Sequence, residues 1–159
     1  MKNGRLDELD RYILYSLQQD ARNTSSGDIA EEWGVSSSTV RKRLQRLEEN
    51  GVITGYHVDI DYEAAGFPLY AKLICSAPIP ERETLAKQAL EIPGVEAVRE
   101  IMNGHKNVYI NVLGTDHEDL SRIGKDLYDL GLEIEDEQII HNEYVCSYRG
   151  FLARDDIER

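Results

Sequence analysis

Residues 35–51 read VSSSTVRKRLQRLEENG, and this stretch has the sequence of one helix with defined ends. Ser36 or Ser37 can cap it by accepting from free backbone N–H groups, and Gly51 is a natural left-handed stop. One side of this helix is apolar and the opposite side is basic. The apolar side has Val40, Leu44 and Leu47, and the basic side has Arg41, Lys42, Arg43 and Arg46. Such a helix suits the major groove of DNA, because its hydroxyls and N–H groups can meet phosphates and its guanidinium groups can meet phosphates or guanine edges.

The neighbouring segments decide between a DNA-reading helix and a basic face that serves only solubility. Residues 25–34 (SSGDIAEEWG) read as a second short helix with a hydroxyl cap and a glycine stop. Two short helices across a tight turn form a helix-turn-helix, whose second helix reads DNA. Residues 6–20 add an amphipathic helix in front. Residues 52–61 alternate apolar and polar side chains, which predicts a strand. The three helices and this β-element predict a winged helix-turn-helix.

Composition limits the class of protein. The 159 residues are 41% hydrophobic, which allows one or two packed domains. The sequence contains no apolar run of about 18 residues that would cross a membrane, and no signal peptide begins it. We therefore expect a cytoplasmic protein without a membrane partner. The two cysteines, Cys75 and Cys146, do not form a disulfide framework and are expected to be small buried apolar residues.

The charge is unusual for a DNA-binding protein, since the chain has a formal net charge of −12. Residues 1–62 hold 8 basic and 11 acidic residues, whereas residues 63–159 hold 10 and 19. The acidic excess therefore lies mainly outside the candidate reader. Lysine is scarce, with 6 Lys against 12 Arg. This composition resembles that of proteins from salt-loving archaea. At the high salt concentration in such cells, counterion release would add little to the affinity for DNA.

The second half of the chain has its own order of elements. Gly66 and Pro68 break the pattern, which predicts a boundary near residue 62. Strands are predicted at 69–76, 95–102 and 107–113, with a last strand within 133–148; helices are predicted at 80–92 and 116–131. The order βαββαβ is that of a ferredoxin-like domain. The sequence thus predicts an α+β protein, with a winged helix-turn-helix at 1–62, a ferredoxin-like domain for ligand binding and dimerisation at 63–148, and a C-terminal tail at 149–159.

Two predicted strands of this domain have large side chains on both faces. Residues 69–75 are interrupted only by Lys72, and residues 139–148 place Ile139 and Val145 on one face and Ile140, Tyr144 and Tyr148 on the other. In an open sheet with helices on one side, the far face should be polar. We therefore expect a second copy of the chain to cover it.

The sequence resembles the Lrp/AsnC, or feast/famine, family of transcription regulators over roughly residues 5–148. The similar segments are 6–14 (LDELDRYIL), 34–36 (GVS), 40–56 (VRKRLQRLEENGVITGY), 93–95 (PGV), Gly104 and 130–132 (LGL). The resemblance implies a homodimer that assembles further into tetramers or octamers, binds partly palindromic promoter DNA and responds to a small effector, often an amino acid. It also assigns DNA contacts to Ser37, Ser38, Thr39, Arg41, Lys42, Arg46 and Tyr56, and less securely to Arg43.

The sequence departs from this family at the expected effector site. The family turn is typically Gly-Asp-x-Asp, whereas this chain has Gly104-His105-Lys106-Asn107. The carboxylates that would pair with the ammonium group of an amino acid are therefore absent. Three alternatives remain: a different and more acidic ligand, another carboxylate such as Glu137 in place of the missing acids, or a site that binds nothing.

Catalysis and cofactor binding have little support in the sequence. His57, His105, His117 and His141 lack the spacing of a metal site, and no phosphate-binding loop or nucleophile arrangement occurs. We expect no enzyme activity, cofactor or metal, since only fold analogy favours an enzymatic or small-molecule-binding ferredoxin-like protein. A DNA-coating architectural protein without an effector remains the main alternative to a regulator.

Overall fold

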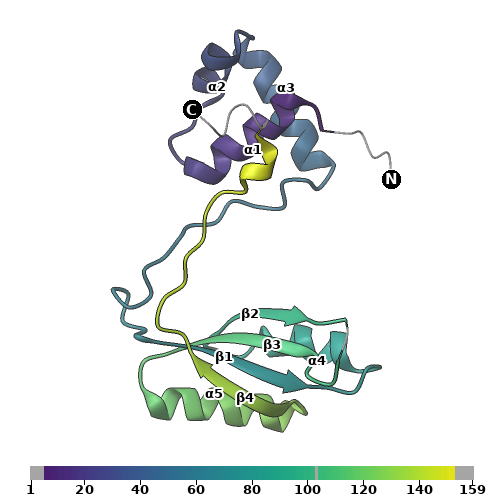
Figure 1. Cartoon of the computed structure of the whole chain (residues 1–159), viewed down its shortest axis with the longest axis vertical. Coiled ribbons are helices and arrows are strands. Elements are labelled where there is room, and N and C mark those ends of the chain that lie inside the picture. Colours follow the sequence, from purple (N-terminus) through teal and green to yellow (C-terminus); the bar gives the residue numbers. More distant parts are fainter. Residues whose placement is uncertain (1–5, 103, 153–159) are drawn as a thin grey trace. The chain divides into compact units, whose positions relative to one another are not determined.

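The helix predicted at residues 35–51 forms in the structure, a computed structural model that describes residues 6–102 and 104–152. It is α3 (Ser37–Glu49) of a chain that divides into two units (Figure 1). The first unit runs to Val58 and includes the segment from Tyr144 onward, and the second is Asp59–Glu143.

All three helices predicted for the first unit are confirmed: α1 (Glu8–Asp20), α2 (Ser26–Trp33) and α3. Each is capped by a side chain that accepts from the backbone three residues on, and these caps are Asp7, Ser25 and Ser36. Gly34 ends α2 with φ of 61°, a left-handed conformation that glycine adopts at little cost. The sharp turn between α2 and α3 therefore follows from local sequence.

The core of this unit is formed by one face of each helix. It contains Leu9, Ile13, Leu14, Ile29, Ala30, Val40 and Leu47. Trp33 packs beside Tyr12 with 5.5 Å between ring centroids. A short 3₁₀ helix, η1 (Arg149–Phe151), places Phe151 against the same core, and the Tyr148 N–H donates to Gln18 at 3.1 Å.

The strand predicted at residues 52–61 is wrong for this structure, which assigns no strand there. The side chains that suggested it are exposed, with 54% for Tyr56, 82% for Val58 and 45% for Ile60. A strand needs a neighbour to accept and donate its backbone hydrogen bonds, and no described segment of the chain pairs with this one.

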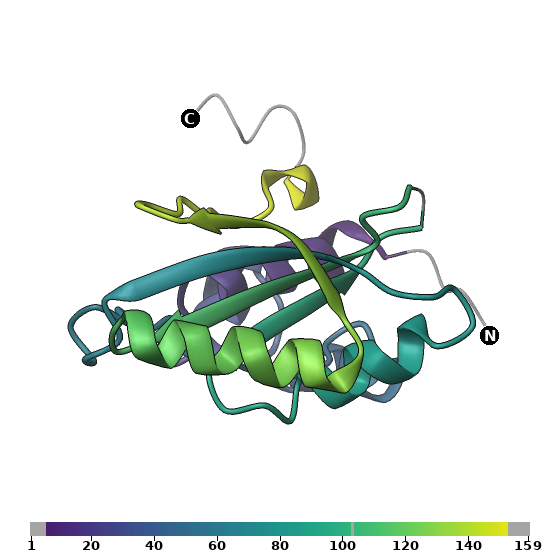
Figure 2. The same ribbon diagram turned by 90° about the horizontal axis from the view of Figure 1, so that it is seen from below.

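The second unit has the predicted βαββαβ order, with β1 (Leu69–Ser76), α4 (Arg82–Ala89), β2 (Val95–Glu100), β3 (Val108–Gly114), α5 (His117–Leu130) and β4 (Glu133–Ile139). The strands form one antiparallel sheet in the order β2-β3-β1-β4. In Figure 2, α4 and α5 lie on the same side of this sheet. Their residues Leu85, Ala89, Ile123 and Leu127 share a core with alternate residues of β1 and β3. The α+β fold class is confirmed.

Three details of the second half differ from the prediction. The last strand ends at Ile139. The Ile140 N–H still donates to the Tyr70 carbonyl, but only Leu69 of β1 lies beyond this bond. The helix predicted at residues 80–92 is shorter, because α4 ends at Ala89, and Leu90 beyond it is 50% exposed. Cys146 is exposed, whereas Cys75 is buried as expected, and burial raises the pKa of the Cys75 thiol to about 11.

Membrane insertion is not indicated by the helices. Within residues 6–102 and 104–152, none is both long and apolar enough to span a bilayer.

Candidate functional site

The exposed face of α3 is the candidate DNA interface, and its hydroxyl groups are ordered around the helix start. Ser36 Oγ accepts from the Thr39 N–H at 3.1 Å and lies 2.8 Å from both Ser38 Oγ and Thr39 Oγ1. Ser36 Oγ therefore uses one lone pair for the cap, and its other contacts hold the Ser38 and Thr39 hydroxyls near the start of the helix. Phosphate oxygens can approach this end, because the N-terminus of a helix is electropositive.

Arg41 and Lys42 are exposed on the same face, one turn further along. Arg41 Nη2 is 3.4 Å from Ser37 Oγ, the only side-chain bond that the described structure gives it. Lys42 has no such bond among the described residues. Both cations are therefore able to turn towards DNA.

Arg43 and Arg46 point towards α1, where both bind Asp10. Arg43 Nη1 is 3.2 Å from Asp10 Oδ1 and also pairs with Asp7, and Arg46 Nη2 is 2.5 Å from Asp10 Oδ2. The Asp10 side chain is 1% exposed, whereas those of Arg43 and Arg46 are 29% and 49% exposed. This group, Asp7, Asp10, Arg43 and Arg46, is the α1–α3 clamp. It leaves Arg46 with donors for DNA on its exposed side but fixes the guanidinium to α1.

Charge and backbone contacts shift the pKa values of two clamp residues, Asp7 and Arg43. Partial burial raises the pKa of Asp7, but the Asp10 N–H and the Arg43 guanidinium outweigh burial and hold that pKa below its usual value. The hydrogen bond from Arg43 to Asp7 correspondingly raises the pKa of Arg43. In the sequence, Asp7 and Asp10 are simply acids at the start of the helix predicted at residues 6–20, and no local pattern indicates their partners 33 to 36 residues away.

Tyr56 lies near the far end of α3 and donates its hydroxyl to Glu48 at 2.8 Å. Partial burial and this carboxylate raise the pKa of Tyr56. The phenol therefore stays protonated at neutral pH, with its proton directed at Glu48.

A pocket of about 530 Å³ in the second unit contains the turn predicted to bind an effector. It is lined by Ser76, Ala77, Pro78, Ile79, Gly104, His105, Asn107, Gly131 and Glu133. At its edge His105 Nε2 is 3.1 Å from Glu135 Oε1, which also accepts from Ser76 Oγ at 2.9 Å. Two carboxylates of β4, those of Glu133 and Glu135, thus lie at the pocket whose turn lacks the two acids typical of the family.

The structure separates the five residues predicted for the effector. Gly104, His105 and Asn107 line the pocket, whereas Lys106 is exposed and is not among the lining residues. The Asn107 amide is already paired, since it donates to the Ala77 carbonyl and accepts from the Ala77 N–H, both at 2.9 Å. Asn107 therefore shapes the turn and has little left for a ligand.

Glu137 lies in a different cavity, of about 220 Å³, beside His117 and Ser121. An irregularity in the β1–β4 register explains this placement. Cys75 pairs with Ile134 and Ile74 with Asp136, so Glu135 is an extra residue in β4. Such a bulge reverses the alternation of side chains beyond it, and Glu137 accordingly pairs with the core residue Leu73. The sequence offered no signal for this bulge, which is why Glu135 was missed.

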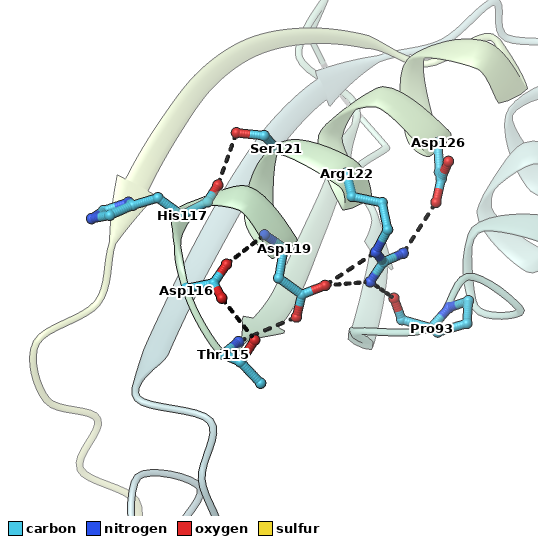
Figure 3. A network of polar contacts seen from close by, with 8 residues as sticks. All are labelled: Pro93, Thr115, Asp116, His117, Asp119, Ser121, Arg122 and Asp126. Atoms are coloured by element: carbon cyan, nitrogen blue, oxygen red, sulfur yellow. Dashed lines mark hydrogen bonds and ion pairs between the residues drawn. The ribbon is translucent and has the colours of Figure 1, made fainter.

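Polar contacts also fix the start of α5 (Figure 3). Arg122 binds Asp119 at 2.6 Å, Asp126 at 3.1 Å and the Pro93 carbonyl at 3.1 Å. The bond from Arg122 lowers the pKa of Asp119. In Figure 3 the His117 ring points away from this group. The network ties α5 to the turn before β2.

Metal-binding side chains do not gather in the described ranges. No group of three or more His, Cys, Asp or Glu residues there has the geometry to hold an ion.

Comparisons with known proteins agree with this geometry. Residues 6–54 match the profile of winged helix-turn-helix DNA-binding domains. The HTH-type transcriptional regulator LrpA of Pyrococcus horikoshii is 35% identical over 121 residues, which cover 74% of this chain and 82% of that protein. The regulator AldR of Mycolicibacterium smegmatis is 34% identical over 119 residues, which cover 74% and 69%.

Solved structures extend the likeness over nearly the whole chain. A feast or famine regulatory protein of M. tuberculosis, complexed with L-methionine, superposes with a TM-score of 0.77 at 28% identity, covering 89% of this chain and 95% of that one. The leucine response regulatory protein LrpA of the same species gives a TM-score of 0.75 at 28% identity, covering 90% and 97%. With its winged helix-turn-helix, βαββαβ unit and regulators among its relatives, the chain belongs to the Lrp/AsnC family of DNA-binding transcriptional regulators.

Proposed function

We propose that this DNA-binding regulator responds to an amino acid or a related small metabolite, bound in the pocket beside Gly104. The observation that carries the proposal is the pair of β4 carboxylates, Glu133 and Glu135, at a pocket whose turn has lost its own acids. A relative of the same fold is complexed with L-methionine, which supports a ligand of this class.

The pocket offers partners for both charges of an amino acid. Glu133 lines it and Glu135 lies at its edge, so that either carboxylate can accept from an ammonium group. Gly104 has φ of 97°, and the backbone N–H groups of such a turn can donate to a ligand carboxylate. Ile79, 76% exposed, provides apolar surface for a side chain.

We expect Glu135→Gln to weaken the amino-acid response about tenfold or more, because a charge-assisted hydrogen bond contributes roughly 1.5–3 kcal/mol. The measurement is calorimetric titration of the full chain with each of the common amino acids. Glu137→Gln is the matched control: it is the same change on the same strand, in the other cavity, and should leave the affinity unchanged. Equal losses for both variants would refute the assignment of the pocket, and absence of heat with every amino acid would refute the ligand class.

The regulator is further proposed to act as a homodimer through the open face of the sheet. Alternation along β1 and β3 places six residues opposite the helix-covered core: Tyr70, Lys72, Ile74, Tyr109, Asn111 and Leu113. Asn111 is 2% exposed, and its Oδ1 has no hydrogen-bond partner among the described residues. A buried acceptor without a partner costs about 1–3 kcal/mol, which indicates that packing at this face is incomplete in a single chain.

We expect a dimer in sedimentation equilibrium at micromolar concentration, and a monomer for Tyr109→Glu, which adds a charge to this face. Tyr128→Glu is the control, because Tyr128 is an exposed tyrosine on α5, on the other side of the sheet. A wild-type monomer, or a dimer that Tyr109→Glu leaves intact, would contradict an interface at this face.

Dimerisation would pair two α3 helices, each entering a major groove about 34–36 Å from the other along one face of DNA. Ser37, Ser38, Thr39, Arg41, Lys42 and Arg46 are proposed to supply the contacts, with Tyr56 near the backbone. The chain has 30 acidic and 18 basic residues, and this acidic excess supports adaptation to a salt-rich cell interior, as in halophilic archaea. High salt weakens phosphate contacts most, so base contacts would matter more for this protein.

A further inference from the structure

Gln45 occupies the middle of the exposed face of α3, yet it is not among the cations and hydroxyls that mark this helix in the sequence. A helix turns about 100° per residue, so Gln45 falls about 20° from Ser38 and between Arg41 and Lys42. These four positions have the spacing i, i+3, i+4 and i+7, from which homeodomain reader helices contact bases. Gln45 is exposed.

The clamp limits which cations of α3 are free to face DNA. Arg43 and Arg46 are turned to the buried Asp10, so two of the four cations of α3 are drawn towards α1. The long side chains with hydrogen-bond donors that remain on the exposed face of α3, without a polar contact to α1 within the described residues, are those of Arg41, Lys42 and Gln45. Two cations can meet phosphates or guanine, but neither presents the donor and acceptor together that adenine requires.

Gln45 presents both groups, and its neighbour holds it in place. Its Nε2 donates to Glu49 Oε1 at 2.8 Å, which occupies one amide hydrogen. The second amide hydrogen and Oε1 remain for a base. A glutamine amide in the major groove donates to N7 and accepts from the N6 amino group of adenine.

We propose that Gln45 reads an adenine in each half-site of the operator and that Glu49 positions its amide. This inference rests on DNA reading by α3 and adds the base that the helix prefers. The alternative is a surface Gln–Glu pair that slightly stabilises α3 and contacts nothing else.

The test is selection of binding sites from randomised duplex DNA by the full chain and by two variants, Gln45→Ala and Gln45→Arg. The wild type should enrich sites with an adenine at one position of each half-site. Gln45→Ala should lose that preference and bind the wild-type site about 5- to 150-fold more weakly. Gln45→Arg should select guanine at the same position, because arginine pairs with guanine O6 and N7.

Gln88→Ala, which changes an exposed glutamine of α4, is the control and should select the wild-type sites. A gain of guanine by Gln45→Arg cannot arise from misfolding, so this variant remains informative even if Gln45→Ala is unstable. Identical sites for all variants, an equal loss of affinity on every sequence, or a lost preference for a base other than adenine would each overturn the proposal. A wild type that enriches no sequence would instead refute sequence-specific reading by α3.

Discussion

Asp10→Ala is expected to lower the free energy of unfolding of the first unit by about 2–3 kcal/mol. The substitution removes the acceptor of Arg43 and Arg46 together with the hydrogen bond to the Asp7 N–H that completes the cap of α1. Loss of one partner from a buried ion pair costs roughly 3–5 kcal/mol, but both arginines are partly exposed and can regain water. Trp33, the only tryptophan of the chain, lies in this unit, so its fluorescence during urea unfolding reports the change.

Asp28→Ala is the matched control for this result. Asp28 has the same position in the cap of α2 that Asp10 has in the cap of α1, and its carboxylate accepts from the Ser25 N–H at 2.8 Å. It is exposed and pairs with no arginine in the described structure. We expect a clearly smaller loss of stability than for Asp10→Ala, because an exposed cap residue leaves no buried charge without a partner. If both variants lost the same stability, the clamp would contribute nothing beyond capping.

The sequence predicted those parts of the fold that depend on neighbouring residues. The helices of the first unit begin at Asp7, Ser25 and Ser36 because these side chains satisfy backbone donors three residues away. The turn at Gly34 and the order of strands and helices along the second half likewise follow from local conformational preference and hydrophobic alternation. Such signals act over a few residues, and a single sequence contains them in full.

Features that depend on distant partners could not be predicted in this way. Alternation at Tyr56, Val58 and Ile60 indicated a strand, but alternation does not supply a pairing strand. The last strand was predicted too long for the same reason, since pairing stops where β1 begins. The effector site was affected by one extra residue, Glu135, which moved Glu137 to the other face of the sheet.

The clamp shows the same limit at the DNA interface. From the sequence alone, Arg41, Arg43 and Arg46 are three cations of one helix that differ only in their position around the helix axis. Asp10 makes them different by holding Arg43 and Arg46. Which of these cations can turn freely towards a groove is therefore decided by a carboxylate on another helix, 33 to 36 residues earlier in the chain.

This difference leads to the largest expected effect on DNA binding, that of Arg41→Ala with Lys42→Ala. Both side chains are exposed on the open face of α3 and neither belongs to the clamp. Each base contact of this kind contributes about 1–3 kcal/mol, so the double variant should bind an operator roughly 30- to 20,000-fold more weakly. Fluorescence anisotropy at several salt concentrations should also show a salt slope smaller by about 1 for each lost phosphate contact.

Lys87→Ala with Lys125→Ala removes the same charge from exposed positions of α4 and α5. Because the chain is strongly acidic, loss of two cations anywhere increases its repulsion from DNA, and this control measures that general effect. We expect it to be small, since repulsion between separated surface charges is screened within about 10 Å at 0.1 M salt. Equal weakening by the two double variants would mean that net charge, rather than the open face of α3, governs binding. A difference of tenfold or more would locate the interface at Arg41 and Lys42, on the face that the clamp leaves uncovered.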